Sequence, residues 1–215
     1  MLLIAPMPWA AEKSALSQAE QIREEIVVTA DRNAQPLKHT GNSISVISKE
    51  QIENRGFDFA SEAMRQIPGL SVNQSGPIGS VTQIRIRGAE ANHTLVLIDG
   101  FKANDPAIGS EFNFADLTTF DVDQIEVVRG SQTALYGSDT IGGVINLITS
   151  TPDKTGFSGK AYVAAGNNQS DLYLLNLNGK GERHYVLANF SKYNTNGTNA
   201  SLMGSEEDGY ENQTE

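Results

Sequence analysis

The stretch that decides the fold is VVRGSQTALYGSDTIGGVINLIT, from Val127 to Thr149. Residues Val122–Arg129 alternate as a β-strand does, and Gln132–Tyr136 lacks helix breakers, which predicts a short helical turn. Val144–Thr149 is rich in residues that favour strands. The pair Gly142-Gly143 permits backbone conformations that a β-carbon would forbid. The stretch therefore predicts two strands joined by a tight turn with a short helix.

The residues before this stretch predict a compact α+β domain. Ser43–Ile47 alternates as a strand, and Ser48 with Gln51 forms a capping box for a helix from Lys49 to about Arg55. A second helix should follow, because four apolar residues repeat at helical spacing, namely Ala60, Ala63, Met64 and Ile67. Further strands are expected at Leu70–Val72, around Ile84 and Ile86, and around Leu95 and Leu97, separated by two long loops, 73–80 and 103–114.

Two arginines occupy alternate positions beside this core. In the strand around Ile84 and Ile86, the alternation predicts that Arg85 and Arg87 project together from one face, opposite Ile84 and Ile86. Like charges on one strand face must be solvated or paired with carboxylates. If this domain sits inside a β-barrel, carboxylates on the polar, water-lined inner wall of the barrel would provide the pairing.

Several segments, in the same order, resemble the TonB-dependent outer-membrane receptors. Arg129-Gly130, Tyr136-Gly137 and Gly142–Asn146 resemble the signature of that family's plug domain. Ile84–Gly88 and Leu95–Gly100 resemble its central plug strands, and Glu25–Ala30 resembles its Ton box. The similarity covers Glu25 to Thr149, more than half of the 215 residues.

Composition excludes several other classes of protein. The net charge of −10 disfavours nucleic-acid binding, and the absence of cysteine removes disulfides and thiolate metal sites. The three histidines, at 39, 93 and 184, are too dispersed for a zinc site. No arrangement of nucleophile, base and supporting residues indicates an enzyme.

The N-terminal residues predict an exported protein. Residues 1–11 are interpreted as the remnant of a signal peptide, although a frayed apolar terminus is the alternative. Residues 12–41 form a flexible segment that includes the Ton box, Glu25, Ile26, Val27, Val28, Thr29 and Ala30. An isolated β-prone run can add to the sheet edge of a partner. From the residues alone, a first strand of the domain itself is an equal alternative.

The C-terminal residues have a different hydropathy pattern from the rest of the chain. Segments 158–166, 170–178 and 185–192 are of similar length and alternate between apolar and polar, as strands of an outer-membrane barrel do. Tyr173, Leu175 and Leu177 share one face, as do Val186, Ala188 and Phe190. A soluble antiparallel meander is the alternative. Residues 194–214 show no strand pattern and are interpreted as the start of an extracellular loop, and the chain is expected to be a fragment that is cut near Glu215.

The predicted fold class is an α+β plug domain, a mixed sheet with short helices, at residues 42–152. The first antiparallel strands of a transmembrane β-barrel follow at 153–215. The resemblance implies an outer-membrane receptor whose plug gates the barrel, with a periplasmic N-terminus and with TonB of the inner-membrane energy-transducing complex as its partner. It also implies that Arg87 and Arg129 dock the plug by pairing with glutamates of the barrel wall.

Within the family the chain most resembles the cobalamin receptors, on the evidence of Ala89–His93, Tyr136–Asn146 and the acidic loop 206–210. That resemblance assigns ligand contacts to the loops 73–80 and 102–111, with candidate residues Asn73, Gln74, Ser75, Ser80, Asn104, Asp105, Ser110 and Phe112. It assigns calcium binding to Glu206 and Asp208; no other cofactor is expected. Because the remaining acidic residues of such a site are not present up to Glu215, a ferric-siderophore receptor is the alternative, and a soluble periplasmic binding module is the alternative from another class.

Overall fold

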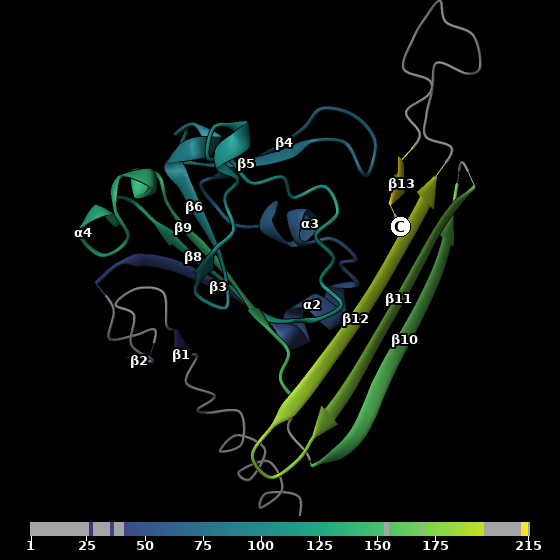
Figure 1. The fold of residues 1–215 in the computed structure, drawn as a ribbon. Coiled ribbons are helices and arrows are strands. Elements are labelled where there is room, and N and C mark those ends of the chain that lie inside the picture. The colour runs from purple at the N-terminus through teal and green to yellow at the C-terminus, as the bar shows by residue number, and fades with distance from the viewer. Residues whose placement is uncertain are drawn as a thin grey trace, which may run out of the picture.

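A mixed sheet and a layer of long antiparallel strands lie side by side in the computed structural model (Figure 1). The structure describes residues 41–152, 155–167 and 169–195. It also describes the backbone of three short strands, β1 (Ile26–Val27), β2 (Gln35–Pro36) and β13 (Asn212–Thr214). The expected signal segment at residues 1–11 and the candidate calcium ligands Glu206 and Asp208 lie outside the described residues.

The mixed sheet is the centre of the domain that the sequence predicts to be a plug, and which is called the plug below. Its strand order is β3-β8-β9-β6-β7, and β6 pairs with β9 in parallel whereas the other pairs are antiparallel. The strands are β3 (Ser43–Ser48), β6 (Thr94–Ile98), β7 (Phe101–Lys102), β8 (Val122–Arg129) and β9 (Gly143–Thr149). The two strands of the deciding stretch, β8 and β9, lie in the middle of the sheet and are largely buried.

Short helices accompany this sheet, as the sequence predicts. The helix α2 (Lys49–Arg55) has the predicted capping box of Ser48 and Gln51 and ends at Gly56, whose φ is 64°. The helix α3 (Ala60–Met64) follows, and both helices lie between the sheet and the long strands (Figure 1). Their apolar side chains join those of the sheet in one core that includes Ala60, Ala63, Met64, Ile84, Ile86, Ile125, Val127 and Ile145.

The remaining elements of the plug surround the sheet. The hairpin of β4 (Leu70–Gln74) and β5 (Thr82–Ile86) forms a separate two-stranded sheet. The turns η2 (Ala91–His93) and η3 (Pro106–Ile108) lie on either side of β6 and β7 in the chain. The predicted helical turn after β8 is present as α4 (Thr133–Tyr136), and η4 (Ser138–Thr140) leads into β9. Among the described residues no helix is long and apolar enough to cross a membrane.

Gly143 explains why the deciding stretch needs its glycine pair. Its φ of 154° is one that residues with side chains rarely adopt, and a β-carbon there would collide with the carbonyl oxygen of Val128. The same β-carbon would lie 2.9 Å from Cδ1 of Ile86. A residue with a side chain therefore cannot bring β9 this close to β8 without moving the backbone.

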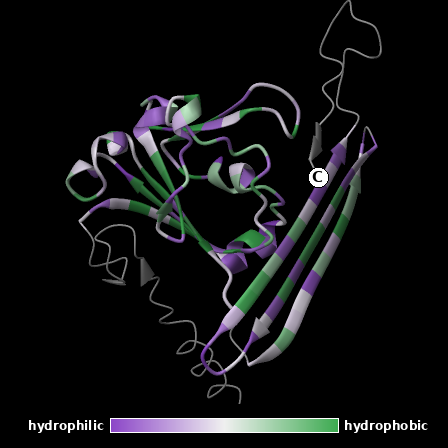
Figure 2. Ribbon diagram, in the orientation of Figure 1, coloured by the Kyte–Doolittle hydropathy of each residue, from purple (hydrophilic) through white to green (hydrophobic). Residues whose placement is uncertain are grey.

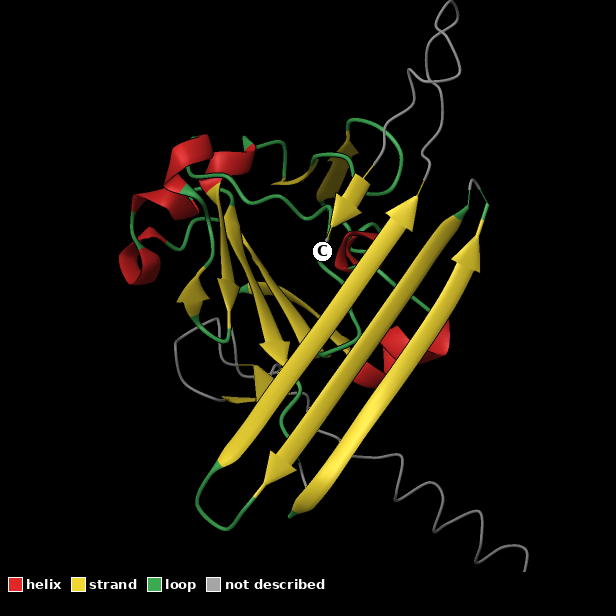
Figure 3. Ribbon diagram, turned by 45° about the vertical axis from the view of Figure 1, so that its right-hand side comes forward, coloured by secondary structure: helices red, strands yellow, loops and turns green. Residues whose placement is uncertain are grey.

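The long strands form one wall. They are β10 (Gly156–Gly166), β11 (Ser170–Lys180) and β12 (Tyr185–Thr195), and they run obliquely beside the plug (Figure 3). Their neighbours in register share faces: Ala161, Leu175 and Phe190 are paired across the sheet, as are Gly159, Leu177 and Ala188. Hydropathy alternates along each strand (Figure 2).

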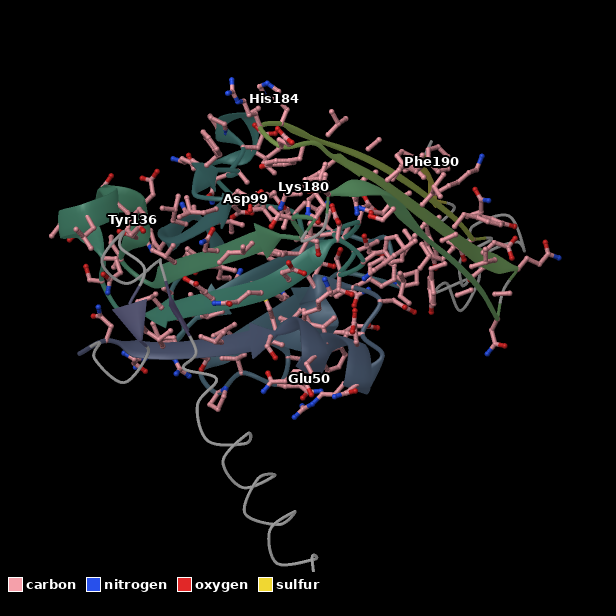
Figure 4. All side chains as sticks on the ribbon, turned by 90° about the horizontal axis from the view of Figure 1, so that it is seen from below. Glu50, Asp99, Tyr136, Lys180, His184 and Phe190 are labelled. Atoms are coloured by element: carbon pink, nitrogen blue, oxygen red, sulfur yellow. The ribbon has the colours of Figure 1, made fainter. Side chains whose placement is uncertain are left out.

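The outer face of this wall is apolar and the inner face is mixed. Phe190 points away from the plug (Figure 4), and it is exposed together with Tyr173, Leu175 and Leu177. The alternation predicted for barrel strands is thus confirmed on the outer face. The inner face is less polar than predicted, because Leu172 and Leu174 are buried there beside Asn176.

Two sequence predictions are corrected by the structure. The strand β5 ends at Ile86, and Arg87 takes a left-handed φ of 52° before Gly88, so Arg87 does not continue on the face of Arg85. Arg85 instead pairs with Glu90 at 3.4 Å. Residues 194–214 were expected to contain no strand, but β12 extends to Thr195 and pairs with β13. Ladder hydrogen bonds join backbone groups, so this pairing needs no apolar pattern.

Candidate functional site

The second loop predicted to bind a ligand is joined to β5, the strand that follows the first such loop. The side chain of Gln83, on β5, donates a hydrogen bond to the Glu111 carboxylate, and the backbone N–H of Thr82 donates to Oδ1 of Asn113 at 2.9 Å. Each loop also exposes an apolar side chain, since Ile78 is 42% exposed and Ile108 is 52% exposed. The pair of loops therefore presents both apolar and polar groups, as ligand sites usually do.

The β4–β5 loop is held by its own polar residues. Both the backbone N–H and the hydroxyl of Ser75 donate to the Val81 carbonyl at 3.1 Å. Gln74 donates to the Pro77 carbonyl at 2.8 Å and accepts from Arg65 at 3.0 Å. Asn73 is exposed, whereas Ser80 is buried and its hydroxyl has no hydrogen-bond partner among the described residues. Ligand contact by these four residues stays a prediction.

The second loop is organised around Asn104, which is buried. Its amide accepts from the N–H of Val96 at 2.7 Å and donates to the carbonyls of Thr94 and Ser110 at 3.0 and 2.9 Å. These contacts support the loop from within, so a direct ligand contact by Asn104 would require the loop to open. Asp105 is exposed and caps the turn η3 by accepting from the N–H of Ala107 at 2.8 Å.

An ion pair fixes the base of this second loop. Lys102 Nζ lies 2.6 Å from Oδ2 of Asp139, on the neighbouring turn η4. The hydrogen bond from Lys102, with a second from Ser138, holds the pKa of the Asp139 carboxyl below its ordinary value of 3.8. The pair is solvent-exposed, so it orients the loop more than it stabilises the domain.

The two phenylalanines of the second loop pack against each other. Phe114 is buried, and the ring centroid of Phe112 lies 4.7 Å from that of Phe114 at an interplanar angle of 74°. Phe112 is partly buried against the core. Phe112 therefore packs beneath the loop, and ligand contact by its exposed part stays a prediction.

A cavity of about 450 Å³ lies between the plug loop and the wall. Pro77 and Ile78 contribute from the β4–β5 loop, and Leu172, Tyr193 and Thr195 contribute from the inner face of β11 and β12. The rings of Phe59 and Tyr193 meet edge to face there, with centroids 6.0 Å apart. The cavity places the β4–β5 loop beside this end of the wall.

The arginines predicted to dock the plug are brought together, although they come from different strands. A β-carbon on Gly69 would lie 3.8 Å from Cγ of Arg87 and 3.7 Å from Cδ of Arg129. Arg129 also donates to the Pro68 carbonyl at 2.5 Å. No ion pair of either arginine is present among the described residues. Their pairing with wall glutamates therefore stays a prediction.

The Ton box is described only at Ile26–Val27, which form β1. This strand pairs with β2, so that Ile26 faces Pro36 and Val27 faces Gln35, at the end of the plug away from the β4–β5 hairpin (Figure 1). A two-residue ladder that includes a proline is weak, because proline has no N–H to donate. β1 belongs to no larger sheet in the described residues, which leaves it accessible for strand addition.

Sequence reasoning missed the contribution of the wall to the cavity. Leu172 and Tyr193 lie on the strands predicted for a barrel, but alternation along a strand does not tell which part of the plug the inner face meets. That contact depends on packing between segments distant in the sequence. Among the described residues, no group of three or more acidic or histidine side chains could hold a metal ion.

The comparisons with known proteins agree with this architecture. The family model of the TonB-dependent receptor plug domain matches residues 36–144. The vitamin B12 transporter BtuB of Photobacterium profundum is 35% identical over 176 residues, covering 81% of this chain and 28% of that protein. The BtuB of Vibrio vulnificus is 41% identical over 133 residues, covering 62% of this chain and 22% of that protein. The chain thus spans about a quarter of the length of these relatives.

Solved structures show the same fold. The pyoverdine outer membrane receptor FpvA of Pseudomonas aeruginosa superposes with a TM-score of 0.67 at 22% identity, over 80% of this chain and 25% of that one. The siderophore receptor PiuA of Acinetobacter baumannii superposes with a TM-score of 0.61 at 27% identity, over 78% of this chain and 23% of that one. With a plug-family match over half its length and strands that continue as in these receptors, the chain belongs to the TonB-dependent receptors, outer-membrane proteins whose plug lies inside a β-barrel.

Proposed function

We propose that the complete protein is a receptor that takes up cobalamin across the outer membrane with energy delivered through TonB. The observation that carries this proposal is the similarity to two vitamin B12 transporters, at 35% and 41% identity. Both alignments are longer than the plug-family match of residues 36–144 could account for alone, at 176 and 133 residues. The role is one of transport, and no enzymatic step is assigned to it.

The arrangement of the loops supports a ligand site at the end of the plug that carries the β4–β5 hairpin. Exposed Ile78 and Ile108 offer apolar surface to a large ligand, and the exposed Asn73 and Asp105 offer hydrogen-bonding groups beside it. The adjacent cavity of about 450 Å³ adds wall residues such as Tyr193. Such a mixture suits an amphiphilic ligand like a corrinoid, in which amide side chains surround an apolar ring.

The opposite end of the plug is where the energy would enter. TonB would pair with the Ton box by strand addition, in which backbone hydrogen bonds provide most of the affinity. A pull on residues 25–30 would then be transmitted to the plug through the chain that leads into β3, at the edge of the central sheet. The plug would rearrange and allow the ligand to pass through the barrel.

A ferric-siderophore receptor is the second candidate. The observation that favours it is the structural similarity to the siderophore receptor PiuA, at 27% identity. Competition separates the two: cells that express the full-length receptor are incubated with labelled cobalamin and with an excess of either unlabelled cobalamin or a ferric siderophore mixture. Displacement by cobalamin alone supports the first proposal. Receptor-dependent accumulation of siderophore iron, with no cobalamin binding, would replace it with the second.

Calcium binding by Glu206 and Asp208 is proposed as an aid to ligand binding. Both residues lie outside the described residues, and the support is the clustering of carboxylates at Glu206, Glu207 and Asp208 next to Gly209. Calcium takes six to eight oxygen ligands in proteins, so these side chains would need further ligands from other loops of the complete receptor.

A further inference from the structure

One carboxylate of the plug, that of Asp121, receives hydrogen bonds from two wall strands. Asp121 lies one residue before β8, and its Oδ1 accepts from Nδ2 of Asn176 on β11 at 2.8 Å. Its Oδ2 accepts from Nδ2 of Asn189 on β12. Asn176 Nδ2 also lies 2.6 Å from Oδ1 of Asn189, so the three side chains form a closed cluster.

The wall is built to present these two amides together. Asn176 and Asn189 are directly paired in the register of β11 and β12, which places their side chains on the same face. Asn176 is only 2% exposed and lies two residues from the buried Leu174 on that inner face. Burying an amide that has no hydrogen-bond partner costs free energy. The carboxylate of Asp121 lowers this cost by accepting a hydrogen bond from the buried amide of Asn176.

The neighbouring Asp123 serves the plug instead. Its Oδ1 lies 2.5 Å from Lys49 Nζ and 2.6 Å from the Ser150 hydroxyl, both within the plug. Asp121 and Asp123 look equivalent in the sequence, but Asp121 bonds to the wall and Asp123 bonds within the plug. Burial raises the pKa of the Asp121 carboxyl, whereas the hydrogen bond from Asn189 opposes that rise. The Asp121 carboxylate is thus partly shielded from water and hydrogen-bonded to Asn176 and Asn189 of the wall.

Asp121 also lies where the plug joins the wall covalently. Its backbone carbonyl accepts from the N–H of Ser150, just after β9, at 2.8 Å. Further along the connection between plug and wall, Lys180, the last residue of β11, donates a hydrogen bond to the Pro152 carbonyl at 2.7 Å. The cluster therefore acts beside a tether that already limits how far this part of the plug can move from the wall.

We propose that Asp121, held by Asn176 and Asn189, is a docking residue that seats the plug on its first wall strands, independently of Arg87 and Arg129. The proposal rests on the plug-in-barrel arrangement and not on the identity of the transported ligand. The described side-chain contacts of Arg87 and Arg129 involve Pro68, Gly69 and Gly130, and none of them involves a residue of the cluster. It gives the plug an attachment that differs in kind from the predicted arginine pairs, because it is made by a charge-assisted hydrogen-bond cluster.

A reciprocal exchange tests this role in the full-length receptor. Asp121→Asn replaces an acceptor oxygen by a donor, so at least one hydrogen bond of the cluster is lost however the amides turn. Asn189→Asp alone places two carboxylates in contact. The double variant Asp121→Asn with Asn189→Asp restores one carboxylate and two amides, because the carboxylate introduced on β12 can accept from both amides. Glu182→Gln removes a negative charge from an exposed position in the turn between β11 and β12 and is the control.

The readout is the labelling of a thiol placed between plug and wall. Leu174→Cys, introduced into every variant including the reference, provides a reporter at a position that is 5% exposed on the inner face. A water-soluble maleimide applied to isolated outer membranes then measures how often the plug leaves this site. Each single variant should raise the labelling rate at least about five-fold, the factor that corresponds to ~1 kcal/mol. The double variant and Glu182→Gln should label within about two-fold of the reference.

Two results would overturn the proposal. Reference-like labelling of both single variants would mean that the cluster does not hold the plug. A double variant as strongly labelled as the singles would mean that the substitutions act through general damage and not through the contact. Because no ligand enters the assay, a failed cobalamin test would leave these results unchanged, so the two proposals can fail separately.

Discussion

The side chains of Arg87 and Arg129 meet beside Gly69, where a β-carbon would lie within 3.8 Å of one and 3.7 Å of the other. Arg87 reaches this place because its left-handed φ turns it out of β5, and Arg129 reaches it from the end of β8. Two arginine side chains that converge on one part of the plug are expected to pair with carboxylates of the enclosing wall.

The double variant Arg87→Ala, Arg129→Ala should loosen the plug inside the barrel. Removing one partner of a buried ion pair typically costs ~3–5 kcal/mol, because the other charge is left unpaired. In cells with the full-length receptor we expect increased leakage of a large antibiotic through the outer membrane. Lys192→Ala, which removes a positive charge from a wall strand, is the control. Unchanged leakage at normal receptor levels would exclude the docking role.

Gly143→Ala should disrupt the plug itself. The added β-carbon collides with the Val128 carbonyl and meets Ile86, and the φ of 154° is unfavourable for alanine. We expect a destabilisation of more than about 2 kcal/mol, read as increased protease sensitivity of the plug in outer membranes. Gly41→Ala, at a position with no neighbouring atom within 4 Å, should behave as the unsubstituted receptor. Equal protease resistance of the two variants would show that β8 and β9 can separate at low cost.

Acid should weaken the plug through Asp123. Burial raises the pKa of this carboxyl, but hydrogen bonds from Lys49 and Ser150 and the charge of Lys49 outweigh that effect and lower it below 3.8. A lowered pKa stabilises the folded state above the ordinary pKa, and this contribution is lost as the pH falls through the folded value. The side chains of Lys49 and Asp123 are 40% and 34% exposed, so their ion pair should contribute less than about 1 kcal/mol to the free energy of unfolding.

Comparison of Asp123→Asn with the unsubstituted receptor measures this contribution. Protease sensitivity of the plug is followed from pH 7 to about pH 3, since the ordinary aspartate pKa lies near 3.9. The variant should already be the more sensitive at pH 7, and the difference should shrink as the pH falls. A difference that grows toward acid would mean that Asp123 is not stabilising as the carboxylate.

The sequence predicted those elements whose signals are local. The capping box of Ser48 and Gln51 marks the start of α2, and the glycine pair before Val144 marks the entry into β9. Strand alternation likewise predicted the apolar outer face of the wall, including Phe190. Each of these signals lies within a few residues of the element that it specifies.

The remaining features depend on contacts between distant segments. Nothing near Asp121 distinguishes it from Asp123, because the difference comes from Asn176 and Asn189 on the wall. The turn at Arg87 could not be predicted from alternation, although the following Gly88, with a φ of 80°, was a signal that the strand ends there. Asn104 was assigned to ligand binding because the resemblance places a ligand loop at 102–111, whereas its burial follows from the packing of its loop against β6.

Removal of calcium should weaken ligand binding if Glu206 and Asp208 hold the ion. Chelation should lower the cobalamin affinity of the full-length receptor by about ten-fold or more, on the scale of typical coupling energies of 1–3 kcal/mol. The variant Glu206→Gln, Asp208→Asn should bind more weakly and should no longer respond to chelation. Identical titrations with and without calcium would instead support a solvated acidic loop.

The Ton box provides the sharpest test of the transport proposal. In strand addition the backbone supplies most of the affinity, so side-chain identity matters less than the ability to donate hydrogen bonds. Val27→Pro and Val28→Pro remove a donor and fix φ, whereas Val27→Ala and Val28→Ala keep the backbone intact. Because alternate residues of an added strand direct their N–H toward the partner, the two proline variants are expected to differ in severity.

The decisive measurement is made in cells that express the full-length receptor, with surface binding and energised accumulation of labelled cobalamin recorded side by side. We predict that both proline variants bind cobalamin as the unsubstituted receptor does, that at least one of them fails to accumulate it, and that both alanine variants accumulate it nearly normally. Normal accumulation in both proline variants would contradict the central claim, because the segment Glu25–Ala30 would then not be the element through which TonB drives transport.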